Sequence, residues 1–444
     1  MIKSCSRPLM GLLAVTAAVA MGLSGCGSSG ASSSGSGSTT ETPAFTLAAS
    51  PSVVSVAQGG SGSSTVTTAV SGGFDSSVAL TASGEPAGVT VSFSSASLAA
   101  PGAGTATVTL TAASTAAAGS YTITVTGAGG SVTHTATITL TVTTASTVTP
   151  RLVGYLPDYD GSYAGFATSL NFNKMTYLVL AFGVPPACNG TCTAGSDMTW
   201  GLSSGVQSDA EIAALVTAAH NAGVKVMLSI GGGSNTTDDR ISAFYNAGLS
   251  TQLAASLDSY LTAHNLDGVD VDIEDPSNMG ANYEAFVNAL IDKMHPEGKI
   301  VSAAVAEWLQ TQNVMSNSTL QEFDFVNVMV YSDLSDCQNA LTYFAGLGEP
   351  SGQMTLGVPF FGQNADGSVA ETYATILAAY PDAWQSDEVS GGTLDGGVTL
   401  YYVGESTMAK ETQLGAQYGG ISIWELSQDA QPPHSLLNVI QSNL

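Results

Sequence analysis

The sequence predicts a multidomain chain, in which a (β/α)8 barrel of the TIM type follows an all-β sandwich. Two observations predict this arrangement. After Arg151, eight short apolar runs alternate with stretches of helical pattern, which is typical of a parallel sheet wrapped by helices. Between Phe45 and Val142, runs of alternating Thr and Val recur between clusters of Gly, Ser and Pro, which is typical of antiparallel strands with one buried face. A chain of 444 residues has room for about two or three such domains.

The first 25 residues are predicted to be a lipoprotein signal peptide. Two basic residues precede an apolar run, which is the layout of an export signal. The segment LSGC at residues 23–26 resembles a bacterial lipobox, in which Cys26 would become the lipidated first residue of the mature chain; the alternative is an ordinary signal peptide that contains a cysteine. Residues 26–44 are rich in Ser and Gly and form a flexible linker in this interpretation. We therefore expect an exported bacterial lipoprotein, anchored at the cell surface or the periplasmic face of a membrane, or otherwise a secreted protein.

Residues 45–146 are predicted to form the β-sandwich, and they resemble the immunoglobulin-like modules of secreted bacterial proteins. The candidate strands begin at Ser64, Val89, Ala106, Tyr121 and Thr133. Such a module can bind carbohydrate, or it can hold the next domain away from a membrane. Sugar platforms generally need exposed aromatic side chains, and this segment has no Trp. Its Phe and Tyr residues are Phe45, Phe74, Phe93 and Tyr121. The composition therefore favours a spacer over a binding module.

Charge and cysteine content exclude several classes of partner. With 9 Lys and Arg against 35 Asp and Glu, the net charge of -26 excludes nucleic acid, because phosphate binding depends on basic side chains. Cys188 and Cys192 can close a small disulfide in an oxidising compartment, which would leave Cys337 unpaired. Because no second cysteine pair or histidine cluster accompanies these three cysteines, we expect no metal site and no cofactor. We expect a monomer.

Residues 150–444 are predicted to form the barrel. The candidate strands begin at Leu152, Tyr177, Lys225, Gly268, Ile300, Phe325, Met354 and Gly420. The clearest helix spans residues 208–222, because Ser208 and Glu211 have the spacing of a capping box and Gly223 stands where a helix would stop. A closed parallel sheet is buried on both faces, which explains why the strands are apolar at nearly every position.

The fourth candidate strand carries three carboxylates at strict alternation. In the segment NLDGVDVDIEDP, Asp270, Asp272 and Glu274 alternate with β-branched apolar residues, so the acids share one face of a strand and point into the barrel. A solvated acidic loop does not need interleaved β-branched residues. A calcium loop counted from Asp270 would need Gly at its sixth position and Glu at its twelfth, where this chain has Asp and Ala.

Glu274 ends this candidate strand, at the carboxyl end where barrel enzymes place their chemistry. Stacked carboxylates about 7 Å apart cannot all ionise in a partly desolvated interior, so we expect at least one raised pKa. A carboxyl group that stays protonated near neutral pH is what a general acid requires. The pattern therefore predicts an acid-base site.

Four motifs occur in the same order as in a known barrel family. The acidic segment, with Asp267 as its first member, matches a DxxDxDxE signature, and SIGG at residues 229–232 matches an SxGG signature. LGVPFFG from Leu356 and GGISIWELSQD from Gly419 match the seventh and eighth strands. In these motifs, the chain from Arg151 to Leu444 resembles glycoside hydrolase family 18, the chitinase family.

This resemblance implies a role for each acidic residue. Glu274 would protonate the glycosidic oxygen, while the carbonyl oxygen of the substrate's own N-acetyl group attacks the anomeric carbon. Asp272 would accept a hydrogen bond from the acetamido N–H, and Asp270 would help to set the protonation of Asp272. Tyr331 would donate its hydroxyl to the acetamido oxygen, and Trp424 would form the hydrophobic floor under that sugar.

Further residues are placed in the substrate site by the same resemblance. Tyr155 and Phe182 would be walls of the pocket, with simple core packing as the alternative. Ser229 and Gly231 of the second signature are counted with the substrate-binding residues, although tight barrel packing also explains the glycines. At the end of the fifth strand, Trp308 and its neighbour Glu307 would add a subsite.

The chain departs from the family pattern at one place that matters. The family usually has Asp after the sixth-strand Tyr, whereas here Ser332 and then Asp333 follow Tyr331. Either Asp333 fills that role after a small shift of the chain, or the contact is missing. The roughly 60 residues between the seventh and eighth strands include a helix and are too short for a large α+β insertion, so we expect an open groove and endo-type cleavage.

Three functions remain after these arguments, and all involve chitin or other N-acetylglucosamine-containing glycans as partners. The first is a chitinase that cleaves β-1,4 bonds with retention of configuration. The second is an endo-β-N-acetylglucosaminidase that acts on N-glycans with the same chemistry. The third is a non-catalytic surface lectin that binds chitin, against which the intact Glu274 argues.

Overall fold

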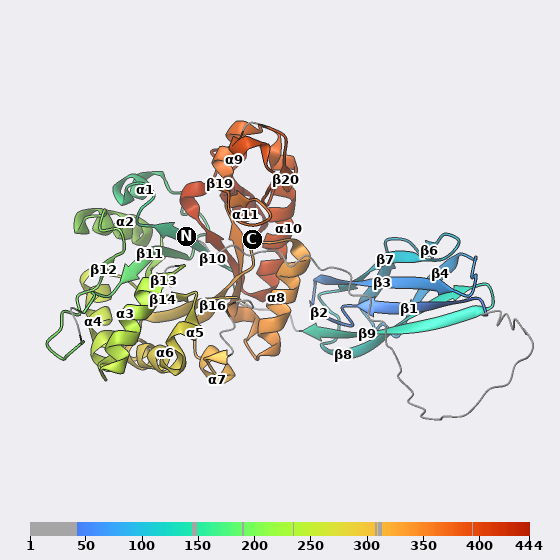
Figure 1. Cartoon of the computed structure of the whole chain (residues 1–444), viewed down its shortest axis with the longest axis horizontal. Helices are drawn as coiled ribbons and strands as arrows, with labels where there is room; N and C mark the ends of the chain where they lie inside the picture. The colour runs from blue at the N-terminus through green and yellow to red at the C-terminus, as the bar shows by residue number, and fades with distance from the viewer. Residues whose placement is uncertain are drawn as a thin grey trace, which may run out of the picture. The chain divides into compact units, whose positions relative to one another are not determined.

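Figure 1 shows the computed structural model of the chain, which describes residues 42–143, 149–188, 191–233, 235–306, 309, 313–392 and 394–444. The chain divides near residue 145 into two compact units. Across the described ranges, none of the helices is both long and apolar enough to cross a membrane.

The N-terminal unit is an all-β module of two sheets. One sheet has the strand order β1-β3-β7-β5, and the other has the order β2-β9-β8-β4-β6. Their bounds are Ala44–Ser50 (β1), Val53–Ala57 (β2), Ser61–Ser71 (β3), Val78–Ser83 (β4), Val89–Phe93 (β5), Ser97–Leu98 (β6), Gly104–Ala112 (β7), Gly119–Gly129 (β8) and Val132–Thr143 (β9). Alternate residues of both sheets are buried in one core, which includes Val66 and Val108 from the first sheet and Ile123 and Ile138 from the second. The predicted sandwich is therefore confirmed.

The aromatic side chains of this module serve its core. Phe45 and Phe74 are buried, with ring centroids 5.2 Å apart. Phe93 and Tyr121 are partly buried and pack against the same core. Within residues 42–143, the module thus presents none of its Phe or Tyr rings as a fully exposed platform.

The C-terminal unit contains a closed barrel of eight parallel strands. Their order is β10-β22-β17-β16-β15-β14-β13-β11, and a β10–β11 pairing closes the ring. Their bounds are Arg151–Pro157 (β10), Tyr177–Val184 (β11), Lys225–Gly232 (β13), Gly268–Ile273 (β14), Ile300–Val305 (β15), Phe325–Met329 (β16), Met354–Pro359 (β17) and Gly420–Trp424 (β22). Every predicted strand is present. Two ends differ: β14 ends before Glu274 and β16 ends two residues before Tyr331, so both side chains stand on the loops that follow.

Helices surround this barrel, as Figure 1 shows. Their bounds are Tyr163–Ser169 (α1), Asp209–Asn221 (α2), Asn235–Asn246 (α3), Ser250–Ala263 (α4), Pro276–Met279 (α5), Ala281–Met294 (α6), Asn317–Leu320 (α7), Leu334–Gly346 (α8), Tyr373–Ala379 (α9), Glu405–Tyr418 (α10) and Leu436–Asn443 (α11). Helix α2 begins with the predicted capping box, in which Ser208 and Glu211 bond each other's backbone N–H groups. It ends before Gly223, whose φ of 79° suits a left-handed stop.

The interval between β17 and α10 contains the expected helix and also a small sheet. Four short strands form an antiparallel sheet in the order β19-β18-β21-β20. They span Phe361–Gln363 (β18), Ala370–Thr372 (β19), Glu388–Val389 (β20) and Leu400–Tyr401 (β21). Together with α9 they make a small lobe, seen at the top of the barrel unit in Figure 1. The lobe is small, which agrees with the expectation that this interval is too short for a large α+β insertion.

The barrel interior changes from apolar to polar along the strands. Near their amino ends it is filled by apolar side chains such as Val153, Met227 and Phe325. Toward their carboxyl ends, buried Ser229, Asp270, Ser302, Asn327 and Thr355 follow. Polar groups buried in a barrel need hydrogen-bond partners, so this layer marks the part of the interior where function is to be sought.

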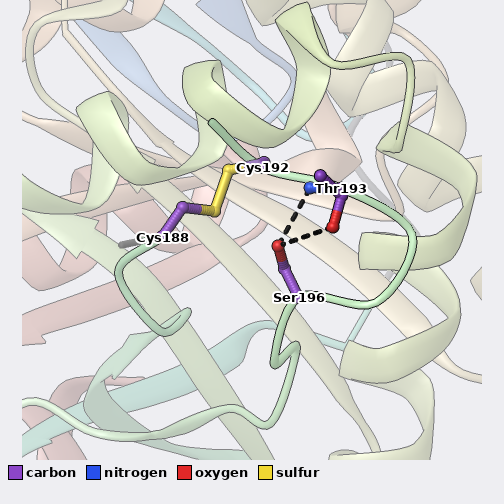
Figure 2. The surroundings of a disulfide bond; sticks show 4 residues. All are labelled: Cys188, Cys192, Thr193 and Ser196. Carbon is purple, nitrogen blue, oxygen red and sulfur yellow. Dashed lines mark hydrogen bonds between the residues drawn. A yellow bond between two sulfur atoms is a disulfide. The ribbon is translucent and has the colours of Figure 1, made fainter. Parts of the chain in front are cut away.

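A disulfide closes the loop that follows β11. Cys188 and Cys192 are bonded, with Cα atoms 5.3 Å apart, and Ser196 Oγ accepts a hydrogen bond from Thr193 N at 2.9 Å in the same loop (Figure 2). Cys337 carries a free and buried thiol. Both outcomes agree with the interpretation of the cysteine spacing.

Candidate active site

A pocket of about 230 Å³ opens at the carboxyl ends of the barrel strands. Its lining residues are Tyr155, Asp272, Ala304, Asn327, Met329, Tyr331, Ser422, Ile423 and Trp424. The structure thus brings together four of the residues predicted from the sequence, contributed by four different strands or the loops after them.

Asp270 lies just below this pocket and is fully buried, with four hydrogen bonds to its carboxylate. Oδ1 accepts from Ser302 Oγ at 2.6 Å and from Asn327 Nδ2 at 3.2 Å. Oδ2 accepts from Ser229 Oγ at 2.8 Å and from the Tyr155 hydroxyl at 2.9 Å. Strand register explains part of this arrangement, because Asp270 pairs with a serine on each neighbouring strand.

Asn327 joins this network to the next strands. Its Nδ2 also donates to the Tyr155 hydroxyl at 2.8 Å, and its Oδ1 accepts from Thr355 Oγ1 at 2.6 Å. The threonine fixes which side of the amide faces Asp270. Sequence reasoning missed both residues, although polar residues at inward positions of FVNVMV and MTLGVP were a signal that could have found them.

The pKa of Asp270 results from two opposed effects. Burial raises it above its usual value, while the hydrogen bonds from Ser302, Ser229, Tyr155 and Asn327 lower it again in part. All four donors are neutral groups. The network therefore supports a carboxylate at this position without a cation.

Asp272 lies one layer nearer the pocket, and its carboxyl group has fewer hydrogen-bond partners than that of Asp270. It is 3% exposed, and its Oδ1 has no hydrogen-bond partner among the described residues. Burial raises its pKa well above the usual value, and the charges of Glu274, Asp270 and Asp238 add to this effect. An unpaired oxygen that lines a pocket is an acceptor available to a ligand.

Glu274 follows β14 directly and is partly buried. Its charge acts on Asp272 and on Tyr331, whose pKa values it raises. The predicted acid is therefore close to both. The expectation that at least one carboxyl of the cluster has a raised pKa agrees with Asp270 and Asp272.

Tyr331 has a φ of 52°, in the left-handed region that few residues other than Gly adopt. Its ring centroid lies 5.7 Å from that of Phe361 at the base of the small lobe. Burial raises its pKa well above the usual value, with further contributions from Asp272, Glu274 and Asp270. Its hydroxyl therefore stays protonated and available as a donor.

The aromatic residues differ in their access to the pocket. The Trp424 ring lies 5.8 Å from that of Tyr155 and stacks on that of Phe182 at 5.5 Å, with 25° between the planes. Tyr155 and Trp424 line the pocket. Phe182 is buried and supports the tryptophan, so for this residue the core-packing alternative describes the structure better.

Two residues expected to bind substrate instead support the barrel. Ser229 is fully buried and donates its hydroxyl to Asp270, so it is not accessible to a ligand. Gly231 has a φ of 119°, and a Cβ there would collide with the carbonyl oxygen of Asp272 on the adjacent strand. The SxGG motif thus holds β13 close to β14. Glu307, Trp308 and the proposed lipidation site Cys26 lie outside the described residues.

Asp333 does not take the role of the Asp that usually follows the sixth-strand Tyr in this family. It is exposed and caps α8, since its Oδ1 accepts from Ser335 N at 2.9 Å and from Asp336 N at 3.0 Å. Ser332 instead donates to Asp336 Oδ2 at 2.6 Å. The structure therefore favours the alternative in which the contact made by the family's Asp is missing, and not the one in which Asp333 replaces it.

Sequence reasoning also overlooked Tyr159, on which the charge of Asp272 acts, and Glu425, the neighbour of Trp424. Tyr159, two residues beyond β10, is 52% exposed. Partial burial raises its pKa, and the charges of Asp160, Glu425 and Asp272 add to this effect. Glu425 is fully buried beside Trp424, and burial raises its pKa to about 7 although Ser427 donates to it. The signal that could have identified Tyr159 was an aromatic residue just after a barrel strand. In the described ranges, no three His, Cys, Asp or Glu side chains are arranged to hold a metal ion.

Comparisons with known proteins agree with this geometry. The family model described as glycosyl hydrolases family 18 matches residues 151–429, which is more than half of the chain. Among solved structures, the family 18 chitinase from the chitin utilization locus of Flavobacterium johnsoniae has a TM-score of 0.56 and 27% identity, over 67% of this chain and 94% of that one. A chitinase-like agglutinin from Robinia pseudoacacia shares the fold, with a TM-score of 0.51 and 19% identity over 66% of this chain and 98% of that one.

A chitinase-like effector of Moniliophthora perniciosa is 33% identical over 111 residues, a match that spans 25% of this chain and 23% of that protein. The matched part is thus less than a quarter of that relative.

Proposed function

The chain belongs to glycosyl hydrolases family 18, and from this premise we propose that it is an active chitinase that cleaves β-1,4 bonds between N-acetylglucosamine units with retention of configuration. The observation that carries the proposal is the contrast between two adjacent carboxyls. Asp270 has four hydrogen-bond donors, whereas Asp272 has an unpaired oxygen in the pocket, near Glu274 and Tyr331.

The pair Asp272 and Glu274 is proposed to share one proton, because each charge opposes ionisation of the other group. An acetamido N–H that donates to the free oxygen of Asp272 favours its ionised form. Substrate binding therefore moves the shared proton to Glu274, where the glycosidic oxygen can receive it. Binding of the sugar thus protonates Glu274, as a general acid requires.

The nucleophile in the proposed reaction is the acetamido carbonyl oxygen of the sugar. It attacks the anomeric carbon as Glu274 protonates the leaving oxygen, and an oxazolinium ion forms. Ionised Asp272 stabilises the positive charge, and Tyr331 donates to the acetamido oxygen. Glu274, now ionised, then takes a proton from the water that opens the oxazolinium ring and restores the configuration.

Binding of the sugar is proposed to use the aromatic residues of the pocket. The face of Trp424 suits the apolar C–H side of a pyranose. Tyr159, exposed beyond β10, offers a second aromatic surface to a neighbouring sugar unit. Because the lobe between β17 and α10 is small, an open groove with endo-type cleavage stays our prediction.

Export of the chain as a lipoprotein is also proposed. The disulfide between Cys188 and Cys192 supports an oxidising compartment. The all-β module is proposed to act as a spacer, which its buried aromatic side chains support.

The test is hydrolysis by the wild-type protein, by Glu274→Gln and by the matched control Glu322→Gln, an identical change at an exposed position of the barrel unit. The substrates are chitin oligosaccharides and a high-mannose glycoprotein. Release of short N-acetylglucosamine oligomers that is lost only in Glu274→Gln supports the proposal, and mixed product lengths support endo cleavage. Release of glycan from the glycoprotein alone would select the endo-β-N-acetylglucosaminidase. Binding of the oligosaccharides without turnover by wild type would select the lectin.

A further inference from the structure

A carboxyl group outside the signature motifs is buried near the acid. Asp238, in the first turn of α3, is 1% exposed, and neither of its oxygens has a hydrogen-bond partner in the described part of the chain. Proteins bury charged groups only with partners, and otherwise bury them in neutral form. An unpartnered carboxyl at this depth therefore needs an explanation.

The position is also unexpected for a helix in this fold. Asp238 shares the buried face of α3 with Ile241 and Phe244. On such a face an apolar side chain stabilises the packing, and a carboxylate does not. Packing of this face therefore does not explain the carboxyl group, although an acidic side chain in the first turn also interacts favourably with the helix dipole.

Helix α3 packs against β13, α4, α5 and α6. The groups whose charges act on Asp238 are Asp275 and Glu274, from the segment between β14 and α5, and Asp239 on its own helix. Asp238 in turn acts on Asp272 of β14 and on Tyr283 of α6, whose buried hydroxyl also lacks a partner among the described residues.

The nearby cations are engaged with other groups. Arg240 on α3 donates to the carbonyl oxygen of Pro185 at 2.9 Å. Lys293 on α6 is bound to Asp258 of α4 at 2.9 Å and to Glu297 at 3.0 Å. The surroundings of Asp238 are therefore acidic, and burial together with these acids raises its pKa to about 7.

We propose that Asp238 is a positioning residue for the acid Glu274, whose proton it helps to retain as the pH rises. This inference rests on the proposed function. Below about pH 7 Asp238 is neutral and leaves Glu274 unaffected. As it ionises above that pH, its negative charge opposes the ionisation of Glu274 and extends the range in which Glu274 is an acid.

The experiment measures kcat/KM for a chitin oligosaccharide from pH 4 to 10 in wild type, Asp238→Asn and Asp238→Leu. The matched control is Asp292→Asn, which removes the same charge from an exposed position of α6. In both Asp238 variants we expect the alkaline limb to move toward acid by about one pH unit, a roughly tenfold loss at a fixed pH on that limb. In the control the limb stays in place. A merely structural role would lower kcat/KM at all pH values without moving the limb, and an unmoved limb overturns the proposal.

Thermal unfolding across the same pH range gives a second readout that does not depend on turnover. Since the pKa of Asp238 is raised to about 7 in the folded protein, its contribution to stability is lost as the pH rises toward that value. The unfolding temperature of Asp238→Asn relative to wild type should therefore increase from pH 4 to pH 8. If wild type turns over no substrate, the proposed function fails. If the difference in unfolding temperature between Asp238→Asn and wild type does not change with pH, Asp238 does not titrate in this range and the inference fails independently of turnover.

Discussion

The hydrogen bond between Ser302 and Asp270 offers a direct measure of how the barrel supports a buried charge. Ser302 Oγ donates to Asp270 Oδ1 at 2.6 Å, and both side chains are fully buried. The change Ser302→Ala removes a single oxygen atom. On that side Asp270 keeps only the longer bond from Asn327, at 3.2 Å.

The expected loss of stability depends on the charge of Asp270. A hydrogen bond to a charged group contributes about 1.5 to 3 kcal/mol, and a bond between neutral groups contributes about 0.5 to 1.5 kcal/mol. Because burial raises the pKa of Asp270, the carboxyl becomes charged only as the pH rises through that value. We therefore expect Ser302→Ala to lower the free energy of unfolding by about 2 kcal/mol at pH 8 and by about 1 kcal/mol at low pH.

The assay is unfolding by guanidinium chloride, followed by tryptophan fluorescence in the full chain. All four tryptophans follow Arg151, so the signal reports the barrel unit and not the all-β module. The matched control is Ser422→Ala on β22, a residue that is 3% exposed and lines the pocket but makes no hydrogen bond to Asp270. A loss in Ser302→Ala no larger than in the control, or one that does not grow with pH, would refute the view that the network holds a carboxylate.

Three further outcomes follow from the structure. Gly231→Ala should lower the free energy of unfolding by several kcal/mol, or prevent folding, because its Cβ would collide with the backbone of β14; chemical unfolding measures this. Glu349 is buried without a partner among the described residues, and its pKa is raised to about 8, so its stabilising contribution disappears as the pH rises through that value. Relative to wild type, Glu349→Gln should gain about 2 to 4 kcal/mol between pH 5 and pH 9 in unfolding experiments. The separate all-β module, residues 42–143, should not sediment with chitin; co-sedimentation would identify it as a binding module.

The fold was predictable where each element carries its own pattern. The barrel strands are apolar at nearly every position, and α2 has both a capping box and a terminal glycine. The small lobe after β17 has no such pattern, because strands of two or three residues are too short to display a period. Its strands exist through their pairing with one another, which a single sequence does not reveal.

The candidate site was predictable along one strand but not across several. Alternation places Asp270 and Asp272 on the same face of β14, which needs only the geometry of a strand. The partners of Asp270 depend on the register of neighbouring strands, so Asn327 was missed and Ser229 was assigned to the substrate. Ser229 does carry a functional hydroxyl, but that hydroxyl faces a carboxylate of the protein.

The buried carboxyls around the pocket show how a chain with few cations controls its acids. With 9 Lys and Arg in 444 residues, ion pairs are scarce, and neutral donors take their place. Asp270 has four such donors, Asp272 keeps one oxygen unpaired and Asp238 has no partner among the described residues. The support for a negative charge therefore decreases from Asp270 to Asp238. The carboxyl groups with the fewest donors, Asp272 and Asp238, therefore hold their protons most firmly, and the negative charge rests on Asp270. The exchangeable protons then lie near Glu274, where the proposed reaction uses them.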